Sequence, residues 1–271
     1  MNIQYQGASD IGNHREVNED FIAVKDYDDN TIFGIVTDGA GSKNTGLQPG
    51  SLIATEIIRE LDNFYKYDKN IIYNYTEILL TEAMRRSGKM LGAFKMGNDE
   101  IYGGLGASAT AFIYHDNKLS VAHVGNTRLY LIRMNQSGEA KLMQLTKDQT
   151  LAQEMVDKGE ITKDDYYLHP DRLSITGGLG VVAEPNIQHF QIPVKENDLV
   201  VLTTDGIHYA IQSEYIKEIA IRSENCEEAL NSIMQAARMQ DYPDNMASIM
   251  MFFQAEQNIK QWRRKRLCWL K

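Results

Sequence analysis

Four short acidic motifs lie far apart in the sequence, and each stands at the edge of an apolar, strand-like run. They are Asn18-Glu19-Asp20, Asp38-Gly39, Asp205-Gly206 and Asp244-Asn245. A carboxylate at the end of a buried strand is held rigidly, and carboxylate oxygens are the ligands that hard divalent cations such as Mg²⁺ and Mn²⁺ prefer. If the fold gathers the four motifs, they form an oxygen-ligand metal site.

The composition is that of one large folded domain. The chain has 271 residues, 43% of them hydrophobic, which is enough for a substantial core, and no Pro- or Gly-rich linker divides it. Its net charge of -9 disfavours broad nucleic-acid binding, because affinity for the phosphate backbone comes from clustered Lys and Arg. A local arginine can still bind a phosphorylated protein segment.

The sequence carries no sign of export, membrane insertion or thiolate metal binding. The first five residues form neither a basic nor an apolar leader, and no apolar run reaches the length of a membrane span. Cys226 and Cys268 have no metal-ligand spacing, so neither a disulfide framework nor a zinc-thiolate site is expected. These features predict a cytoplasmic protein.

Strand-like and helix-like patterns alternate in blocks. Residues 21–24 and 31–37 are β-branched and aromatic runs on either side of the polar stretch 26–30, which predicts a hairpin. Apolar residues at helical spacing predict helices over 52–65 and 71–91.

Three further strand-like runs follow, with turn residues between them. Residues 109–114, 119–124 and 129–133 are joined by 115–118 and 125–127, which predicts an antiparallel meander. The remaining expected elements are helices over 148–158, 213–222 and 226–238 and strands over 188–193, 199–204 and 246–253. Such blocks favour an α+β fold with antiparallel sheets covered by helices.

The motifs and their order resemble those of the type 2C metal-dependent protein serine/threonine phosphatases, in particular bacterial-type members. The matching segments are Ser9-Asp10-Ile11-Gly12 with Arg15, Asn18-Glu19-Asp20, Thr37-Asp38-Gly39-Ala40-Gly41, Gly106-Ala107-Ser108-Ala109-Thr110, Gly125-Asn126-Thr127-Arg128-Leu129-Tyr130, Leu145-Thr146-Lys147-Asp148, His169-Pro170-Asp171-Arg172, Thr204-Asp205-Gly206 and Asp244-Asn245. The resemblance implies a single catalytic domain over 1–255, followed by a tail over 256–271. It also implies two antiparallel β-sheets sandwiched between layers of α-helices, with a two-metal site at one end.

The resemblance also implies a ligand set for two divalent cations, Mn²⁺ or Mg²⁺. The implied ligands are Glu19, Asp20, Asp38, Gly39, Asp205 and Asp244. Asp38 is expected to bridge the two ions, and the carbonyl group of Gly39 to contribute to the second. A metal-bridging hydroxide would attack phosphorus in phosphoserine or phosphothreonine. Arg15 is the expected phosphate clamp, because a guanidinium fork matches two phosphoryl oxygens.

Several positions depart from the family pattern, among them Gln149 in place of a usual histidine and Ser42 in place of a common glycine, and three others bear on the chemistry. Asn126 stands where an aspartate contributes to a third metal, so only a weak third site is expected there. Ala40 replaces a histidine proposed as general acid in eukaryotic members, which leaves protonation of the leaving group to water. Tyr209 occupies a position that is commonly acidic.

Asn126 and Tyr209 leave a second function open, a weakly active or non-catalytic module that binds a phosphorylated partner. A nuclease, which also uses two metals, is disfavoured by the acidic charge and by the motif order. The expected partners of the enzyme are phosphorylated proteins and a cognate serine/threonine kinase.

Two segments outside the metal motifs have open roles. Residues 148–169 correspond to the flap region of the family, and are either a peptide-recognition element or a solvated connection. The tail ends in Trp262-Arg263-Arg264-Lys265-Arg266-Leu267-Cys268-Trp269-Leu270-Lys271. Its basic and aromatic residues suit an anionic membrane surface or an acidic partner groove, or alternatively the tail folds back onto the acidic body.

Overall fold

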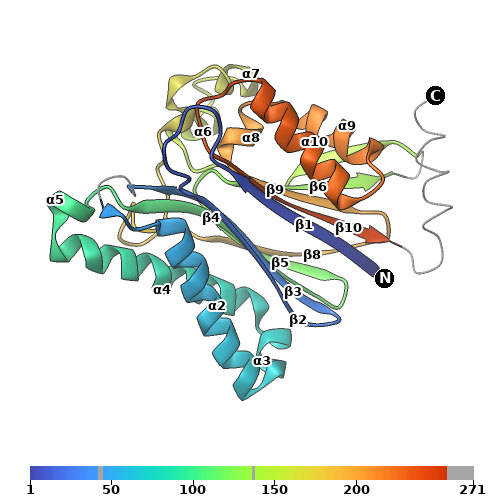
Figure 1. Ribbon diagram of the computed structural model, residues 1–271, viewed down its shortest axis with the longest axis horizontal. Coiled ribbons are helices and arrows are strands. Elements are labelled where there is room, and N and C mark those ends of the chain that lie inside the picture. The colour runs from blue at the N-terminus through green and yellow to red at the C-terminus, as the bar shows by residue number, and fades with distance from the viewer. Residues whose placement is uncertain (42–44, 136–137, 255–271) are drawn as a thin grey trace.

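The computed structural model describes residues 1–41, 45–135 and 138–254, and in these ranges two antiparallel sheets stack face to face. The strand orders are β1-β10-β9-β6-β7 and β2-β3-β4-β5-β8. Helices α2 to α5 cover one outer face and α8 to α10 cover the other (Figure 1). The expected α+β sandwich of two sheets between helical layers is confirmed. The predicted tail over 256–271 lies outside the described residues.

The strands are β1 (Asn2–Asp10), β2 (Asp20–Asp28), β3 (Thr31–Ala40), β4 (Gly106–His115), β5 (Lys118–Val124), β6 (Arg128–Met134), β7 (Ala140–Gln144), β8 (Gln188–Pro193), β9 (Leu199–Thr203) and β10 (Met246–Gln254). The helices are α2 (Pro49–Tyr67), α3 (Lys69–Asn74), α4 (Thr76–Gly97), α5 (Asp99–Tyr102), α6 (Leu151–Asp157), α7 (Lys163–Tyr166), the 3₁₀ helix η1 (Pro170–Leu173), α8 (Asp205–His208), α9 (Ser213–Arg222) and α10 (Cys226–Met239). Among the described helices, none has the length and apolar character of a membrane span.

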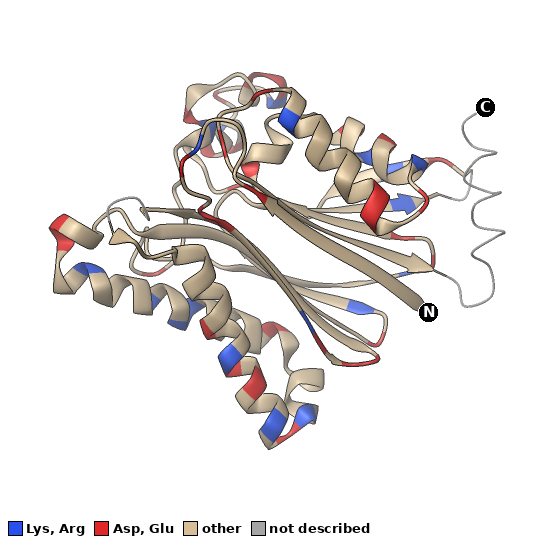
Figure 2. Ribbon diagram, viewed as in Figure 1, with Lys and Arg blue, Asp and Glu red and all other residues tan. Residues whose placement is uncertain are grey.

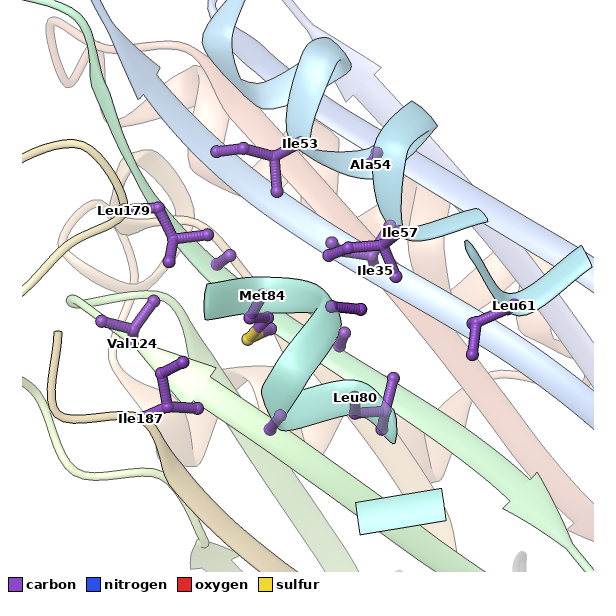
Figure 3. Close-up of a cluster of buried hydrophobic side chains, with 14 of the residues drawn as sticks. Ile35, Ile53, Ala54, Ile57, Leu61, Leu80, Met84, Val124, Leu179 and Ile187 are labelled. Atoms are coloured by element: carbon purple, nitrogen blue, oxygen red, sulfur yellow. The ribbon is translucent and has the colours of Figure 1, made fainter. Parts of the chain in front are cut away.

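The core has three apolar layers because side chains alternate between the two faces of each strand. In β3, Ile35 packs toward α2 and α4, whereas the next residue, Val36, packs between the sheets. Figure 3 shows Ile53 and Ile57 of α2 beside Ile35 in the first of these layers. The outer layer on the opposite sheet lies under α9 and α10. Charges of both signs follow α2 and α4, whereas the central strands β9 and β10 carry no charged residue (Figure 2).

The predicted meander is wrong at its third strand. β4 and β5 pair, but β6 pairs with β7 and β9 in the other sheet, while the free edge of β5 is taken by β8. Gly125 has a φ of +94°, and a Cβ there would lie 2.1 Å from the Ser108 hydroxyl. Residues 125–127 therefore carry the chain across from one sheet to the other, and the glycine is needed where this crossing passes β4.

Other differences from the predicted elements are local. The predicted helix over 71–91 is interrupted at Tyr75 and forms α3 and α4, with Thr76 of α4 hydrogen-bonded to Ser120 of β5 (Oγ1 to Oγ, 2.6 Å). The helix predicted from 148 begins at Leu151, because the Thr150 side chain caps it. Strands β1 and β7 were not predicted.

The connection between β7 and β8, residues 145–187, contains α6, α7 and η1 and is called the flap segment below. The region 148–169, expected to be the flap, lies within it. A buried ion pair fixes its start to the sheets: Nη2 of Arg128 in β6 lies 2.7 Å from Oδ2 of Asp148, with side chains 3% and 1% exposed. Gln144 and Tyr166 also donate hydrogen bonds to this carboxylate.

His123 gives the stability of the domain a pH dependence. The side chain is buried, bonds to Thr110 Oγ1 (2.8 Å) and the Lys147 carbonyl (3.2 Å), and burial lowers its pKa to about 4. Since the unfolded state binds the proton more readily, stability falls as the pH drops from about 6.5 towards 4. Between pH 7.5 and 5, the unfolding free energy of the wild type should fall by about 2 kcal/mol more than that of His123→Gln.

Urea unfolding of both proteins at the two pH values, without added metal, measures this difference. Comparing the two proteins removes the contribution of His208, whose pKa burial also lowers, and that of the acidic residues. Equal losses in wild type and variant would contradict the prediction.

Candidate metal centre

Asp20 and Asp38 lie side by side because they are register partners in the β2–β3 pair. Asp20 is the first residue of β2, and Asp38 lies near the end of β3. The Asn18 side chain accepts a hydrogen bond from the Asp20 amide (3.1 Å), and the Ser9 hydroxyl donates to the Asp20 carbonyl (3.1 Å). The hairpin predicted from the sequence thus places two of the four acidic motifs at one end of one sheet.

Asp205 and Asp244 reach the same end from the other sheet. Asp205 begins α8 just after β9, and Asp244 lies just before β10. A Cβ on Gly206 would lie 1.8 Å from the Asn245 carbonyl, so glycine permits this close approach. The Thr204 hydroxyl, next to Asp205, donates to Asp20 Oδ2 at 2.7 Å and so joins the two sheets. In Figure 2 acidic segments gather at this end of the strands, next to α8.

Mutual repulsion shows that the four aspartates form one electrostatic cluster. Burial raises the pKa of Asp38, and the charges of Asp205, Asp20 and Asp244 raise it further. Burial and the charge of Asp244 raise the pKa of Asp205 to about 7. The pKa of Asp20 is raised by burial and by the charges of Asp205 and Asp244, against the opposing hydrogen bond from Thr204. Ionised together, these groups require positive charge.

Arg15 supplies part of that positive charge. Its Nη2 lies 2.8 Å from Asp244 Oδ1, and its Nε donates to the Pro243 carbonyl at 3.1 Å. The guanidinium group opposes the rise in the pKa of both Asp38 and Asp205. Its side chain is 45% exposed, so it stands at the rim, where an anionic group of a substrate can reach it. The structure therefore places the predicted phosphate clamp beside the acidic cluster.

The other two predicted ligands belong to the same end. The Glu19 amide donates to the Asn245 side chain at 2.9 Å, which ties the β1–β2 loop to the start of β10. A Cβ on Gly39 would lie 2.8 Å from the Glu19 carbonyl oxygen, so this position also needs glycine. All six predicted ligands thus lie on segments that meet at one end of the sandwich.

The donor set fits hard divalent cations. It consists of carboxylate and carbonyl oxygens. The positive charge of Arg15 acts on three of the buried carboxylates and lowers the pKa of each, against the larger effect of burial. Within the described ranges, no three Asp, Glu, His or Cys side chains converge tightly enough to hold an ion by themselves. Mg²⁺-type sites commonly use one or two carboxylates and keep several waters, so an open cluster suits such ions.

Asn126 is placed as a hydrogen-bond partner of a predicted ligand. Its side-chain nitrogen donates to Asp205 Oδ2 at 3.1 Å, and its side-chain oxygen accepts from the Ser108 hydroxyl at 2.8 Å. The buried amide thereby orients Asp205. The weak third-metal site assigned to Asn126 stays a prediction.

Asn245 and Thr204 orient the site and were not assigned these roles from the sequence. The Asn245 side chain donates to the carbonyls of Ile11 (2.8 Å) and Val17 (3.1 Å), in addition to accepting from Glu19. It therefore holds the loop that carries Arg15 and Glu19. Thr204 directly precedes Asp205, and Asn245 directly follows Asp244. This position next to a predicted ligand is the sequence signal that could have identified both residues.

Comparison with known proteins agrees with this geometry. The sequence profile described as Protein phosphatase 2C matches residues 6–262. The serine/threonine phosphatase stp of Listeria welshimeri is 25% identical over 254 residues, which cover 93% of this chain and 95% of that protein.

Solved structures share the fold. The crystal structure of the Mycobacterium tuberculosis serine/threonine phosphatase PstP/Ppp superposes with a TM-score of 0.76 at 24% identity, over 93% of this chain and 99% of that one. The catalytic domain of PstP in complex with two manganese ions gives a TM-score of 0.72 at 24% identity, over 93% of this chain and 99% of that one. Because the family profile matches residues 6–262 of the 271-residue chain, the protein belongs to the protein phosphatase 2C family.

Proposed function

We propose that this chain is a metal-dependent phosphatase that hydrolyses phosphoserine and phosphothreonine in proteins, using two Mn²⁺ or Mg²⁺ ions. The observation that carries the proposal is the convergence of Asp20, Asp38, Asp205 and Asp244 beside Arg15. The family match and the names of the relatives support the same reaction, and the PstP structure with two manganese ions supports the cofactor.

Each residue at the centre has a definite task in this reaction. The carboxylates of Asp20, Asp38, Asp205 and Asp244 would hold the two ions, and Arg15 would orient the phosphoryl group. When bound, the ions activate a water and neutralise charge on the phosphoryl oxygens. Thr204, Asn126 and Asn245 keep the carboxylates and the Arg15 loop in place. Ala40 offers no proton, so water protonates the leaving oxygen.

The direct test is turnover of a small phosphate ester and of a phosphothreonine peptide, each with and without Mn²⁺. Metal-dependent release of phosphate from both substrates is expected. The competing function is a non-catalytic module, which the retained carboxylates disfavour. Tight phosphopeptide binding by metal-loaded protein without turnover would establish that module and exclude the enzyme.

Removing the Arg15 guanidinium should weaken catalysis without unfolding the protein. Because a fork of two donors binds and orients the phosphoryl oxygens, Arg15→Ala should lower kcat/KM for the phosphopeptide by about 10- to 100-fold. Arg15→Lys keeps the charge but loses the fork, so it should restore part of the loss. The matched control is Arg59→Ala, which removes an exposed arginine paired with Glu56 on α2. Equal kinetics for Arg15→Ala and Arg59→Ala would exclude the clamp.

The biological setting proposed here is cytoplasmic signalling, in which the enzyme opposes a cognate serine/threonine kinase. The similarity of the sequence to bacterial serine/threonine phosphatases supports this setting. Contact of the basic tail with a membrane or a protein stays a prediction, since residues 256–271 lie outside the described ranges.

A further inference from the structure

Tyr209 connects the metal centre to the flap segment. It directly follows α8, the short helix that begins at Asp205, and its amide donates to the Asp205 carbonyl at 2.9 Å. Its hydroxyl lies 2.9 Å from the Tyr166 hydroxyl in α7 and donates to the Arg172 carbonyl in η1 at 3.0 Å. One side chain thus touches two separate elements of the flap segment.

The hydroxyl protons can be assigned by counting donors. The buried Asp148 carboxylate only accepts, so Tyr166 must use its proton for the 2.5 Å bond to Asp148 Oδ2. The single proton of Tyr209 is then shared between the Tyr166 oxygen and the Arg172 carbonyl in a three-centre hydrogen bond. A hydrogen-bonded chain therefore runs from the Arg128–Asp148 pair through Tyr166 to Tyr209, and ends beside the metal centre.

The ring of Tyr209 contributes a second set of contacts. The guanidinium carbon of Arg128 lies 5.5 Å from the ring centre, and that of Arg172 lies 5.1 Å from it. Arg172 comes from the flap segment; its Nη1 donates to the His169 carbonyl at 3.2 Å, while its buried Nε has no hydrogen-bond partner among the described residues. The ring face therefore adds a cation–π contact to the hydrogen bonding that holds this cation. An acidic side chain at position 209 could provide neither the hydroxyl donor nor the ring.

We propose that Tyr209 is a positioning residue that fixes the flap segment beside the metal centre and so determines the affinity for peptide substrates. The inference rests on the proposed phosphatase function. The segment that Tyr209 holds exposes Tyr167, Leu168 and Leu173, whose exposed fractions are 45%, 86% and 48%. Large exposed apolar side chains in one short segment are typical of a contact surface, here for the substrate chain beyond its phosphoryl group. A small ester does not extend that far.

The first experiment compares two substrates in Tyr209→Phe, which loses the hydroxyl but keeps the ring. KM for a phosphothreonine peptide should rise about fivefold or more, the factor that one lost hydrogen bond represents, while kcat and the kinetics of a small phosphate ester stay near wild type. Tyr209→Leu, which also loses the ring, should raise the peptide KM further. Equal losses on both substrates would overturn the proposal, because they would place the effect at Asp205.

The matched control is Tyr130→Phe. The Tyr130 hydroxyl accepts a hydrogen bond from Nη1 of the same Arg128 at 3.2 Å, but Tyr130 belongs to β6 rather than to the flap segment. Its removal should leave the ratio of peptide KM to ester KM unchanged. If the control changes this ratio as much as Tyr209→Phe does, the effect comes from Arg128 and the proposal is wrong.

A second experiment needs no enzymatic activity and separates this inference from the proposed function. Hydrogen exchange of the backbone amides should become faster over residues 166–173 in Tyr209→Phe, and stay unchanged there in Tyr130→Phe. If the wild type shows no turnover but this difference appears, the proposed function fails while the positioning role of Tyr209 stands. Unchanged exchange in Tyr209→Phe would overturn the positioning role whatever the activity.

Discussion

Replacing Asp38 by asparagine is expected to reduce turnover of both a small phosphate ester and a phosphopeptide by about 10²- to 10³-fold, the scale seen when one preorganised polar group is lost from an active site. Asp38 is the residue whose pKa is raised by burial and by all three other aspartates of the cluster. A neutral amide at this position removes a charge that interacts with all three other carboxylates, and it would be a weaker ligand for a hard cation.

The same substitution should leave the metal-free fold intact. Because the pKa of Asp38 is raised in the folded protein, its ionised form destabilises the fold at pH 7, and the neutral amide relieves that repulsion. Metal-free Asp38→Asn should therefore melt at or above the Tm of the metal-free wild type. Added Mn²⁺ should raise the Tm of the wild type, because it binds the native state, but should have little effect on the variant.

Asp29→Asn provides the control, since Asp29 is an exposed carboxylate in the turn at the opposite end of the same β2–β3 hairpin. This variant should keep full activity and the full Mn²⁺-induced rise in Tm. Turnover by Asp38→Asn within tenfold of the wild type would contradict the bridging role expected for Asp38.

The sequence predicted the convergence of the acidic motifs better than it predicted the pairing of the strands. The β2–β3 hairpin was predictable because a polar turn separates two apolar runs, and register pairing then placed Asp20 opposite Asp38. Local turn chemistry was misleading at Gly125, whose positive φ serves a crossing between sheets rather than a hairpin. Which strand pairs with β6 depends on β9, which lies about 70 residues away along the chain, and no local pattern records that choice.

The contacts that orient the site were harder to predict than the ligands. Asp205 stands out because it follows an apolar run, but the bond that it receives from Asn126 depends on the same sheet crossing. Tyr209 was identified as a departure from the family pattern, yet its partners Tyr166 and Arg172 are known from the packing of the flap segment alone. Sequence motifs indicate the candidate metal ligands, whereas the residues that orient these ligands are determined by tertiary packing.

The buried Arg128–Asp148 pair should dominate the stability of the flap segment. Asp148→Ala leaves the guanidinium group buried without its counter-charge, and should lower the unfolding free energy by about 3–5 kcal/mol. The control is Asp157→Ala in the same segment. Its pair with Lys147 has side chains 43% and 55% exposed, so its loss should cost less than about 1 kcal/mol. Urea unfolding measures both changes.

A double substitution tests whether charge burial is the cause. Much of the cost of Asp148→Ala comes from the unpaired Arg128, so replacing both partners with apolar residues, as in Arg128→Met with Asp148→Leu, should recover part of the lost stability. The recovered stability need not restore peptide binding, because Tyr166 would still lack its acceptor and Tyr209 would hold a less ordered flap segment. A double variant no more stable than Asp148→Ala would show that packing, rather than the unpaired charge, sets the loss.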